Sequence, residues 1–132
     1  MVKGLENFFF WLFTLAFSLL IPGSMMILGR SFLKNPPGEI NGGYGYRTAR
    51  SMRNRETWAF AQRYSGRFWA RAGRPMLAVS LLWMALLFGQ DIGTVGRFGM
   101  ILTGLQMVPF LAVIPATERA LKREFDDFGR KR

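Results

Sequence analysis

The chain has 132 residues, 50% of them apolar and 15% aromatic, yet it carries a formal net charge of +10 from 18 Lys and Arg against 8 Asp and Glu. This hydrophobicity excludes a disordered tail, since disorder requires low hydrophobicity together with high charge. Cysteine and histidine are absent, which excludes disulfides, Cys or His ligation of metal or haem, thiol nucleophiles and imidazole bases.

The charged residues are clustered and leave three uncharged stretches, at residues 7–29, 75–90 and 98–117. At about 1.5 Å per residue the first and third are roughly 35 and 30 Å long, against a hydrocarbon core of about 30 Å. They predict transmembrane helices over about 6–29 and 96–117. The middle stretch reaches only about 24 Å. We interpret it as a short span over about 75–90 because Arg71 and Arg74 can snorkel; a soluble core helix and a re-entrant segment are the alternatives.

The first stretch contains Pro22-Gly23. A cleavable signal peptide does not fit, because the apolar run is too long, Lys3 is its only early basic residue and no small-x-small cleavage site follows. We therefore expect a retained helix that is kinked at Pro22-Gly23, with neighbouring helices satisfying the freed backbone groups.

The loop after this helix sets the predicted orientation. Residues 30–74 contain ten Lys and Arg against Glu39 and Glu56, and basic loops prefer the cytoplasm. The N-terminus and the turn at 91–97 then lie outside, and the tail 118–132 lies inside. Asn35-Pro36-Pro37-Gly38 and Asn41-Gly42-Gly43 predict that the cytoplasmic loop 30–53 is irregular.

Residues 54–72 are predicted to form an amphipathic helix in the membrane interface, with rings at headgroup level and guanidinium groups near lipid phosphates. Apolar and small residues recur on one face at Trp58, Ala61, Ser65, Phe68 and Ala72, and Arg63, Arg67, Arg71 and Arg74 gather opposite. Asn54 is the expected N-cap, and Gly73 with Pro75 is expected to end the helix. Simple packing of the aromatic residues on the spans is the alternative.

The third stretch and the tail contain few polar candidates. Gln106 is expected to hydrogen-bond another helix, and the glycines of residues 93–104 leave surface for close packing, so self-association or binding of another membrane protein is expected. The absence of ionisable residues from the three stretches argues against a transporter or channel. Glu118 is expected to pair with Lys122 at i,i+4.

The most informative segment is 41–58, which reads Asn-Gly-Gly-Tyr-Gly-Tyr-Arg-Thr-Ala-Arg-Ser-Met-Arg-Asn-Arg-Glu-Thr-Trp. A glycine-rich turn ahead of a helix, with Arg47, Thr48, Arg50 and Ser51, is able to hold a phosphate or carboxylate. Aiming the helix is the structural alternative. The segment matches neither a Walker A loop nor a dinucleotide fingerprint.

The same segment is more informative as the signature of a protein family than as evidence of an anion site. Tyr44-Gly-Tyr-Arg-Thr48, Ser51-Met-Arg-Asn54 and Glu56-Thr-Trp58, followed by Ala61 and Gly66, resemble the SdpI-type family of small bacterial membrane proteins, and Thr117-Glu118, Leu121 and Phe125 are similar to its closing motif. The best-known member is an immunity protein against a secreted toxic peptide. This immunity protein also holds a small repressor at the membrane. The resemblance implies a bacterial inner-membrane protein. Arg53 stands where Lys is usual, and the chain is the short three-span form.

We therefore expect an all-α, non-catalytic, immunity-type binding protein with no cofactor, whose partners are anionic lipids, itself or another membrane protein. Nucleic acid is not expected, since orientation already accounts for the charge. Tyr46 and Trp58 would anchor in the interface, and Arg47, Arg50 and Arg53 would bind phosphate or an acidic partner. The predicted surface comprises Tyr44, Tyr46, Arg47, Thr48, Arg50, Ser51, Arg53, Asn54, Glu56 and Trp58.

Two other functions compete with this prediction. An accessory subunit of a larger membrane complex would use the same arginines and glycines for docking. An enzyme acting on lipid would need Glu56 as its acid or base, but a salt bridge of Glu56 with Arg47 or Arg50 is the more ordinary role.

Overall fold

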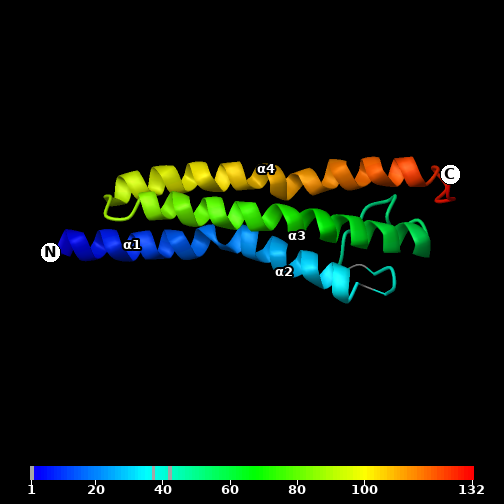
Figure 1. The fold of residues 1–132 in the computed structure, drawn as a ribbon, viewed down its shortest axis with the longest axis horizontal. Helices are drawn as coiled ribbons and strands as arrows, with labels where there is room; N and C mark the ends of the chain where they lie inside the picture. The colour runs from blue at the N-terminus through cyan, green and yellow to red at the C-terminus, as the bar shows by residue number, and fades with distance from the viewer. Residues whose placement is uncertain (1, 37, 42) are drawn as a thin grey trace.

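The computed structural model describes residues 2–36, 38–41 and 43–132. Their regular elements are four helices: α1 (Val2–Ser18), α2 (Leu20–Lys34), α3 (Arg55–Leu86) and α4 (Ile92–Glu124). α1 and α2 form one bent rod, and α3 and α4 lie alongside it, with the two termini at opposite ends (Figure 1). The predicted all-α fold is confirmed. Pro37 and Gly42, which fall in predicted turns, lie outside the described residues.

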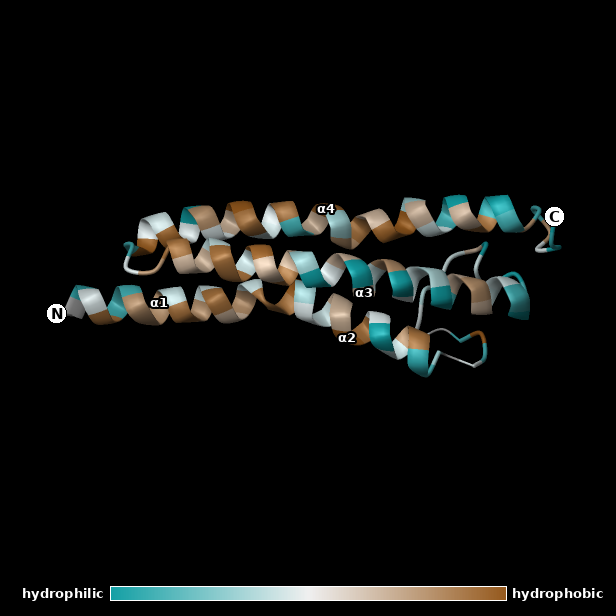
Figure 2. Cartoon of the chain, viewed as in Figure 1, coloured by the Kyte–Doolittle hydropathy of each residue, from teal (hydrophilic) through white to brown (hydrophobic). Residues whose placement is uncertain are grey.

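Two helical stretches, Lys3–Lys34 and Ile92–Glu124, are long and apolar enough to cross a membrane. Apolar residues dominate the half of the bundle that holds the N-terminus, and hydrophilic residues increase toward the C-terminal end (Figure 2). The short span predicted over 75–90 is part of α3 and is not one of these two stretches.

The predicted kink in the first rod is confirmed. Pro22 has no backbone N–H, so the carbonyl of Ser18, four residues earlier, loses its helical donor. The helix breaks at this point, between α1 and α2, and Gln106 Nε2 of α4 donates to Ser18 O at 2.8 Å and to Ser80 Oγ at 2.7 Å. Gln106 is therefore the interhelical partner that the sequence predicted.

α3 differs from the prediction because it is one continuous helix through Gly73 and Pro75. The separate interfacial helix expected over 54–72 is not found; these residues form the first half of α3. Tertiary packing explains the continuity: α2 lies directly against α3, and a Cβ on Gly73 would meet Met26 Cγ at 2.7 Å and Pro22 O at 3.2 Å. This contact outweighs the loss of one hydrogen bond at Pro75.

α2 and α3 approach most closely at a second glycine pair. A Cβ on Gly29 would meet Ala70 N and Gly66 O, both at 2.7 Å, and one on Gly66 would meet Gly29 O at 2.9 Å. Glycine is needed at both positions because two helix backbones touch there. The contact fixes α2, and with it the start of the following loop, against the middle of α3.

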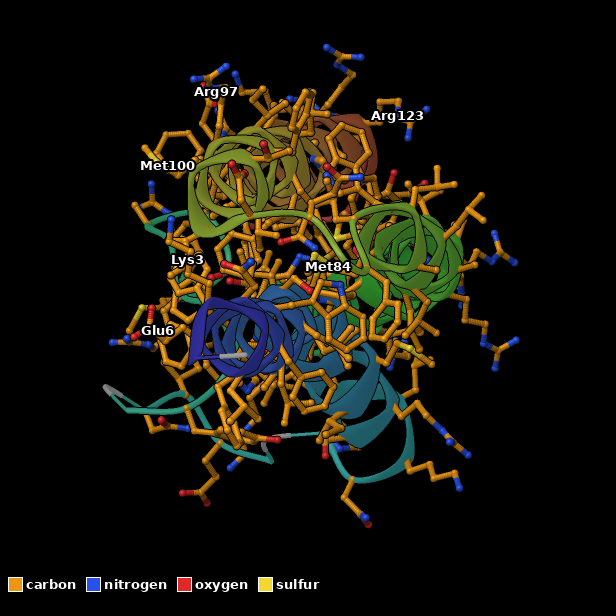
Figure 3. The ribbon with its side chains drawn as sticks, turned by 90° about the vertical axis from the view of Figure 1, so that its left-hand side faces the viewer. Lys3, Glu6, Met84, Arg97, Met100 and Arg123 are labelled. Atoms are coloured by element: carbon orange, nitrogen blue, oxygen red, sulfur yellow. The ribbon has the colours of Figure 1, made fainter. Side chains whose placement is uncertain are left out.

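α4 begins at its N-cap Asp91, whose side chain accepts from Thr94 N at 2.8 Å. It starts four residues before the predicted span and continues to Glu124, so the first part of the predicted tail is helical. The apolar half closes around Met84, which points between the helices (Figure 3) and packs with Leu87, Val95 and Leu102.

Candidate functional site

The loop between α2 and α3 carries the motif of residues 44–58 and turns sharply at Gly45. Gly45 has a φ of 110°, a conformation that other residues rarely adopt. On one side of this turn the exposed ring of Tyr44 packs edge-on against Phe32 of α2, with 5.4 Å between ring centroids. On the other side Tyr46 is buried. The glycine thus places the two tyrosines in different environments.

Gln62 of α3 fixes the backbone of Tyr46. Its Oε1 accepts from Tyr46 N at 2.7 Å, and its Nε2 donates to Tyr46 O at 2.9 Å. Gln62 is fully buried, so these two bonds satisfy an amide that has no access to water. The loop is therefore attached to α3 by paired hydrogen bonds of the kind a neighbouring strand would make.

Glu118 of α4 fixes the side chains of the same loop. Its Oε2 accepts from Tyr46 Oη at 2.7 Å and from Thr48 Oγ1 at 2.9 Å. Burial, and secondly the hydrogen bond to Glu118, raises the pKa of Tyr46 far above its ordinary range, so this hydroxyl stays a donor. The expected ion pair of Glu118 with Lys122 is not found among the described residues; the carboxylate points to the loop instead.

A compact turn then leads into α3. Ser51 Oγ accepts from Thr48 N at 2.8 Å, and Thr57 Oγ1 donates to Ser51 O at 3.1 Å. Asn54 Oδ1 accepts from Thr57 N at 2.9 Å, while Thr57 Oγ1 accepts from Asn54 N at 3.0 Å. This reciprocal capping box confirms Asn54 as the N-cap.

The C-terminal tail closes over the other side of the loop. Arg50 pairs with Asp127 at 2.9 Å, and Asn54 Nδ2 donates to Gly129 O at 2.7 Å. Beneath these polar contacts lies a buried cluster of Tyr46, Ala61, Leu121 and Phe125. Arg50 thus has an acidic partner within the chain, which differs from the pairing with Glu56 that the sequence suggested.

A hollow of about 440 Å³ lies beside this loop, between α2 and α4. Its floor is a stack of three rings: Trp69 of α3 stacks on Phe32 at 6.3 Å and on Phe110 of α4 at 5.3 Å. Its roof is residues 43–48, and its remaining walls are mainly aliphatic, from Leu28, Leu111, Val113 and Ile114. The volume lies in the range of small-molecule pockets.

The structure divides the ten predicted site residues into three groups by exposure. Tyr46, Ser51 and Trp58 are buried, whereas Tyr44, Arg47, Arg53 and Glu56 are exposed; Thr48, Arg50 and Asn54 are half-buried. Tyr46 and Trp58 retain 9% and 1% exposure, so the prediction that they anchor in lipid is wrong. Their apolar surfaces are covered by protein, and for Trp58 this is the packing alternative given above.

Sequence reasoning missed the positions that hold the site together. Gln62 lies inside a helical pattern, where a glutamine on the buried side signals a specific hydrogen bond but not its partner. Glu118 belongs to the closing motif, and its helical spacing predicts a partner on its own helix and not in the loop. The ring stack of Phe32, Trp69 and Phe110 comes from three helices and has no local sequence signal.

The chemistry available at the site is limited. Among the described residues, no group of three or more His, Cys, Asp or Glu side chains is arranged to hold a metal ion. Glu118 already accepts hydrogen bonds from two hydroxyl groups. Glu56 lies exposed in the first turn of α3, where its negative charge interacts favourably with the helix dipole. The arrangement is therefore an apolar pocket with hydrogen-bonding groups and one cationic side chain, Arg47, among its lining residues.

Comparison with known proteins assigns the class. The model of the SdpI/YfhL protein family matches residues 39–117, which include the motif, α3 and most of α4. The chain belongs to this family. Together with its two apolar helices, this identifies it as a membrane protein of the SdpI type.

The chain is also similar to one curated protein. The chain is 39% identical over 70 residues to the uncharacterized protein YfhL of Bacillus subtilis (strain 168). The similarity covers 52% of this chain and 64% of the relative, so less than two thirds of that protein is matched. No solved structure matches the chain.

Proposed function

We propose that this chain is a non-catalytic binding protein of the bacterial inner membrane with an immunity-type role, and that its ligand occupies the pocket under residues 43–48. The observation that carries the proposal is the position of the motif: Tyr44 to Thr48 form one wall of the 440 Å³ pocket. Gln62 and Glu118 hold that wall in place from two helices. A wall fixed in this way keeps the pocket preformed, which reduces the entropy lost on binding.

The proposed placement in the membrane has α1–α2, α3 and α4 as three spans, with the N-terminus outside and the C-terminus in the cytoplasm. The concentration of Lys and Arg in residues 30–74 supports this orientation. The pocket then lies at the cytoplasmic surface of the bilayer, open between α2 and α4. An apolar segment of a membrane-inserted peptide fits its lining, and Arg47 at the rim suits an acidic group on that ligand.

The orientation has a direct test because the chain contains no cysteine. Single substitutions Gln90→Cys, in the turn between α3 and α4, and Lys131→Cys, in the tail, are both at exposed positions. In intact cells a membrane-impermeant maleimide should label Gln90→Cys and leave Lys131→Cys unlabelled until the cells are opened. The reverse pattern contradicts the proposed orientation.

The binding role is tested by filling the pocket. Ile114→Trp places a large ring at a lining position whose side chain is 46% exposed, and Val108→Trp makes the same change on α4 outside the pocket, at 68% exposure. Cells expressing each variant are challenged with a panel of membrane-active bacterial peptides while membrane potential is recorded. We expect protection by the wild type and Val108→Trp, and loss of most of it in Ile114→Trp.

Two outcomes contradict this proposal. If the wild type protects against no peptide, the immunity-type role is wrong. If protection is the same in both tryptophan variants, the pocket is not the binding site. Recovery of the chain in a fixed stoichiometry with another membrane protein would favour the accessory-subunit alternative.

A further inference from the structure

A row of arginines follows the outer face of α3, on the side opposite the pocket. Arg63, Arg67, Arg71 and Arg74 recur every three or four residues, and all four are exposed. A hollow of about 410 Å³ lies along this row, lined by Tyr64, Arg67, Phe68, Arg71 and Ala72. The ion pairs found among the described residues, Arg50–Asp127 and Arg130–Asp126, involve none of these arginines.

Contacts with α4 fix the level of these arginines along the bundle. Trp69 Nε1 donates to Phe110 O at 3.2 Å, and Ser80 Oγ accepts from Gln106 Nε2 at 2.7 Å. Both α4 residues belong to the uncharged run 98–117. Arg71 and Arg74 lie between Trp69 and Ser80 on α3, so they lie beside the uncharged run of α4.

Contacts with the first rod give the same level. Gly73 abuts Met26 and Pro22, which belong to the uncharged run 7–29. Gly66 abuts Gly29, at the end of that run. Arg67 therefore lies near the cytoplasmic end of the first uncharged run, and Arg71 and Arg74 lie roughly 6 and 10 Å further in at about 1.5 Å per residue.

An arginine at such a depth requires an anion or water. Charged residues within spans are rare and mark functional sites when they occur. The chain has no Asp or Glu between residues 57 and 90 to pair with these arginines from their own helix. A second copy of the chain docking through this face would oppose arginine to arginine, which is unfavourable.

We propose that Arg67 and Arg71 bind the phosphates of an anionic phospholipid, drawn inward from the cytoplasmic leaflet along the outer face of α3. The two guanidinium groups are one helical turn apart, a spacing that suits a lipid with two phosphates better than a lipid with one. Tyr64 and Phe68 lie beside them as rings at the headgroup boundary, and basic sites on the cytoplasmic side are typical for such lipids. The inference rests on the membrane placement proposed above.

The test uses the full chain reconstituted in phosphatidylcholine vesicles that contain cardiolipin, phosphatidylglycerol or neither. Lipid retained by the protein after extraction is measured by native mass spectrometry. The wild type should retain cardiolipin in preference to phosphatidylglycerol. Loss of about fivefold in affinity per arginine predicts roughly 25-fold weaker retention for Arg67→Gln/Arg71→Gln.

A matched control is available on α4. Arg119→Gln/Arg123→Gln removes the same charge at the same i,i+4 spacing from two exposed positions outside the apolar runs, and it should retain cardiolipin as the wild type does. Arg67→Lys, which keeps the charge and loses the planar fork, should give an intermediate loss. Inorganic phosphate in the buffer should not displace the lipid.

Separate outcomes bear on the lipid site and on the membrane placement. Equal retention by the wild type and Arg67→Gln/Arg71→Gln overturns the lipid site. A photo-crosslinker at Phe68 that captures a membrane protein instead of lipid overturns it as well. A fluorophore on Leu111→Cys, next to Phe110, should be quenched by lipids brominated on their acyl chains; absence of quenching contradicts the placement itself.

Discussion

At the scale of single residues, the site depends on the hydrogen bonds that Gln62 and Glu118 make with the buried residue Tyr46. Tyr46 presents a backbone amide, a carbonyl and a hydroxyl to the interior, and Gln62 and Glu118 supply a partner for each. An unpaired polar group in such a position costs about 1–3 kcal/mol. The loop conformation is therefore specified by two side chains that lie 16 and 72 residues further along the chain.

The contribution of Glu118 is testable by substitution. Glu118→Ala removes a charged acceptor shared by two hydroxyl groups and leaves that of Tyr46 only the longer bond to Ile114 O at 3.3 Å, so we expect the free energy of unfolding to fall by about 2–3 kcal/mol. Glu118→Gln retains an acceptor oxygen without the charge and should lose about half as much. Denaturant unfolding in detergent measures both. Glu124→Ala, at an exposed position on the same helix, should stay within about 0.5 kcal/mol of the wild type.

Substitution of Thr117 is predicted to increase the free energy of unfolding. Its Oγ1 is fully buried, with no hydrogen-bond partner among the described residues. Thr117→Val replaces this hydroxyl by a methyl group of similar size, and removing an unsatisfied polar group should stabilise the protein by about 1 kcal/mol. The same unfolding assay applies. A loss of stability in Thr117→Val would mean that the hydroxyl is hydrogen-bonded.

At the scale of elements, close packing decides where helices bend and where they continue. Pro22 breaks the first rod because it has no backbone N–H for the Ser18 carbonyl, and Gln106 supplies the replacement donor. Pro75 does not break α3, because α2 packs closely against α3 at Gly73, two residues earlier. The same residue type therefore has different effects, depending on the neighbouring helix.

The glycine contact between α2 and α3 can be tested with one substitution at the contact and a control substitution in the same helix. Gly29→Ala places a methyl group 2.7 Å from two backbone atoms of α3, so the helices must separate, at a cost of about 1–3 kcal/mol. A Cβ on Gly23, in the same helix, meets nothing within 4 Å. Gly23→Ala should gain up to about 1 kcal/mol from helix propensity. Thermal unfolding of both variants tests the opposite signs, and a stabilised Gly29→Ala contradicts the contact.

At the scale of the whole molecule, the two ends of the bundle are built differently. The end with the N-terminus is closed by apolar packing around Met84, and the other end is closed by hydrogen bonds among the loop, α3, α4 and the tail. The two motifs of the sequence, 44–58 and 117–125, meet at this second end. The family signature is thus one folded unit made from separate parts of the chain.

The role of the tail in this unit is measurable by hydrogen exchange. Deleting residues 126–132 removes the partners of Arg50 and Asn54, so amide exchange in residues 47–54 should accelerate by about tenfold or more, since one lost ion pair and one lost hydrogen bond amount to roughly 1.5 kcal/mol. Exchange in the apolar part of α4 should not change. Arg130→Ala, which removes a contact made only within the tail, should leave residues 47–54 protected.

Much of the local structure follows from local sequence. The Asn54 cap, the turn at residues 43–46 and the kink near Pro22 were predictable because each depends on a residue's own backbone preference or on missing donors. The helix end expected at Gly73-Pro75 was wrong because packing against α2 overrides those preferences. The lipid anchoring of Tyr46 and Trp58 was wrong because an aromatic residue in an amphipathic pattern suits a protein interior as well as a membrane surface.

The sequence by itself determined the apolar helices, the cluster of positive charge and the family signature, since these depend only on which residues occur and in what order. The tertiary structure decided that the arginine face of α3 runs beside uncharged spans and that Glu118 holds the motif loop. Both depend on contacts between residues far apart in the chain. Such contacts are fixed by how whole helices pack, as at Gly29 and Gly66, and no local periodicity records them.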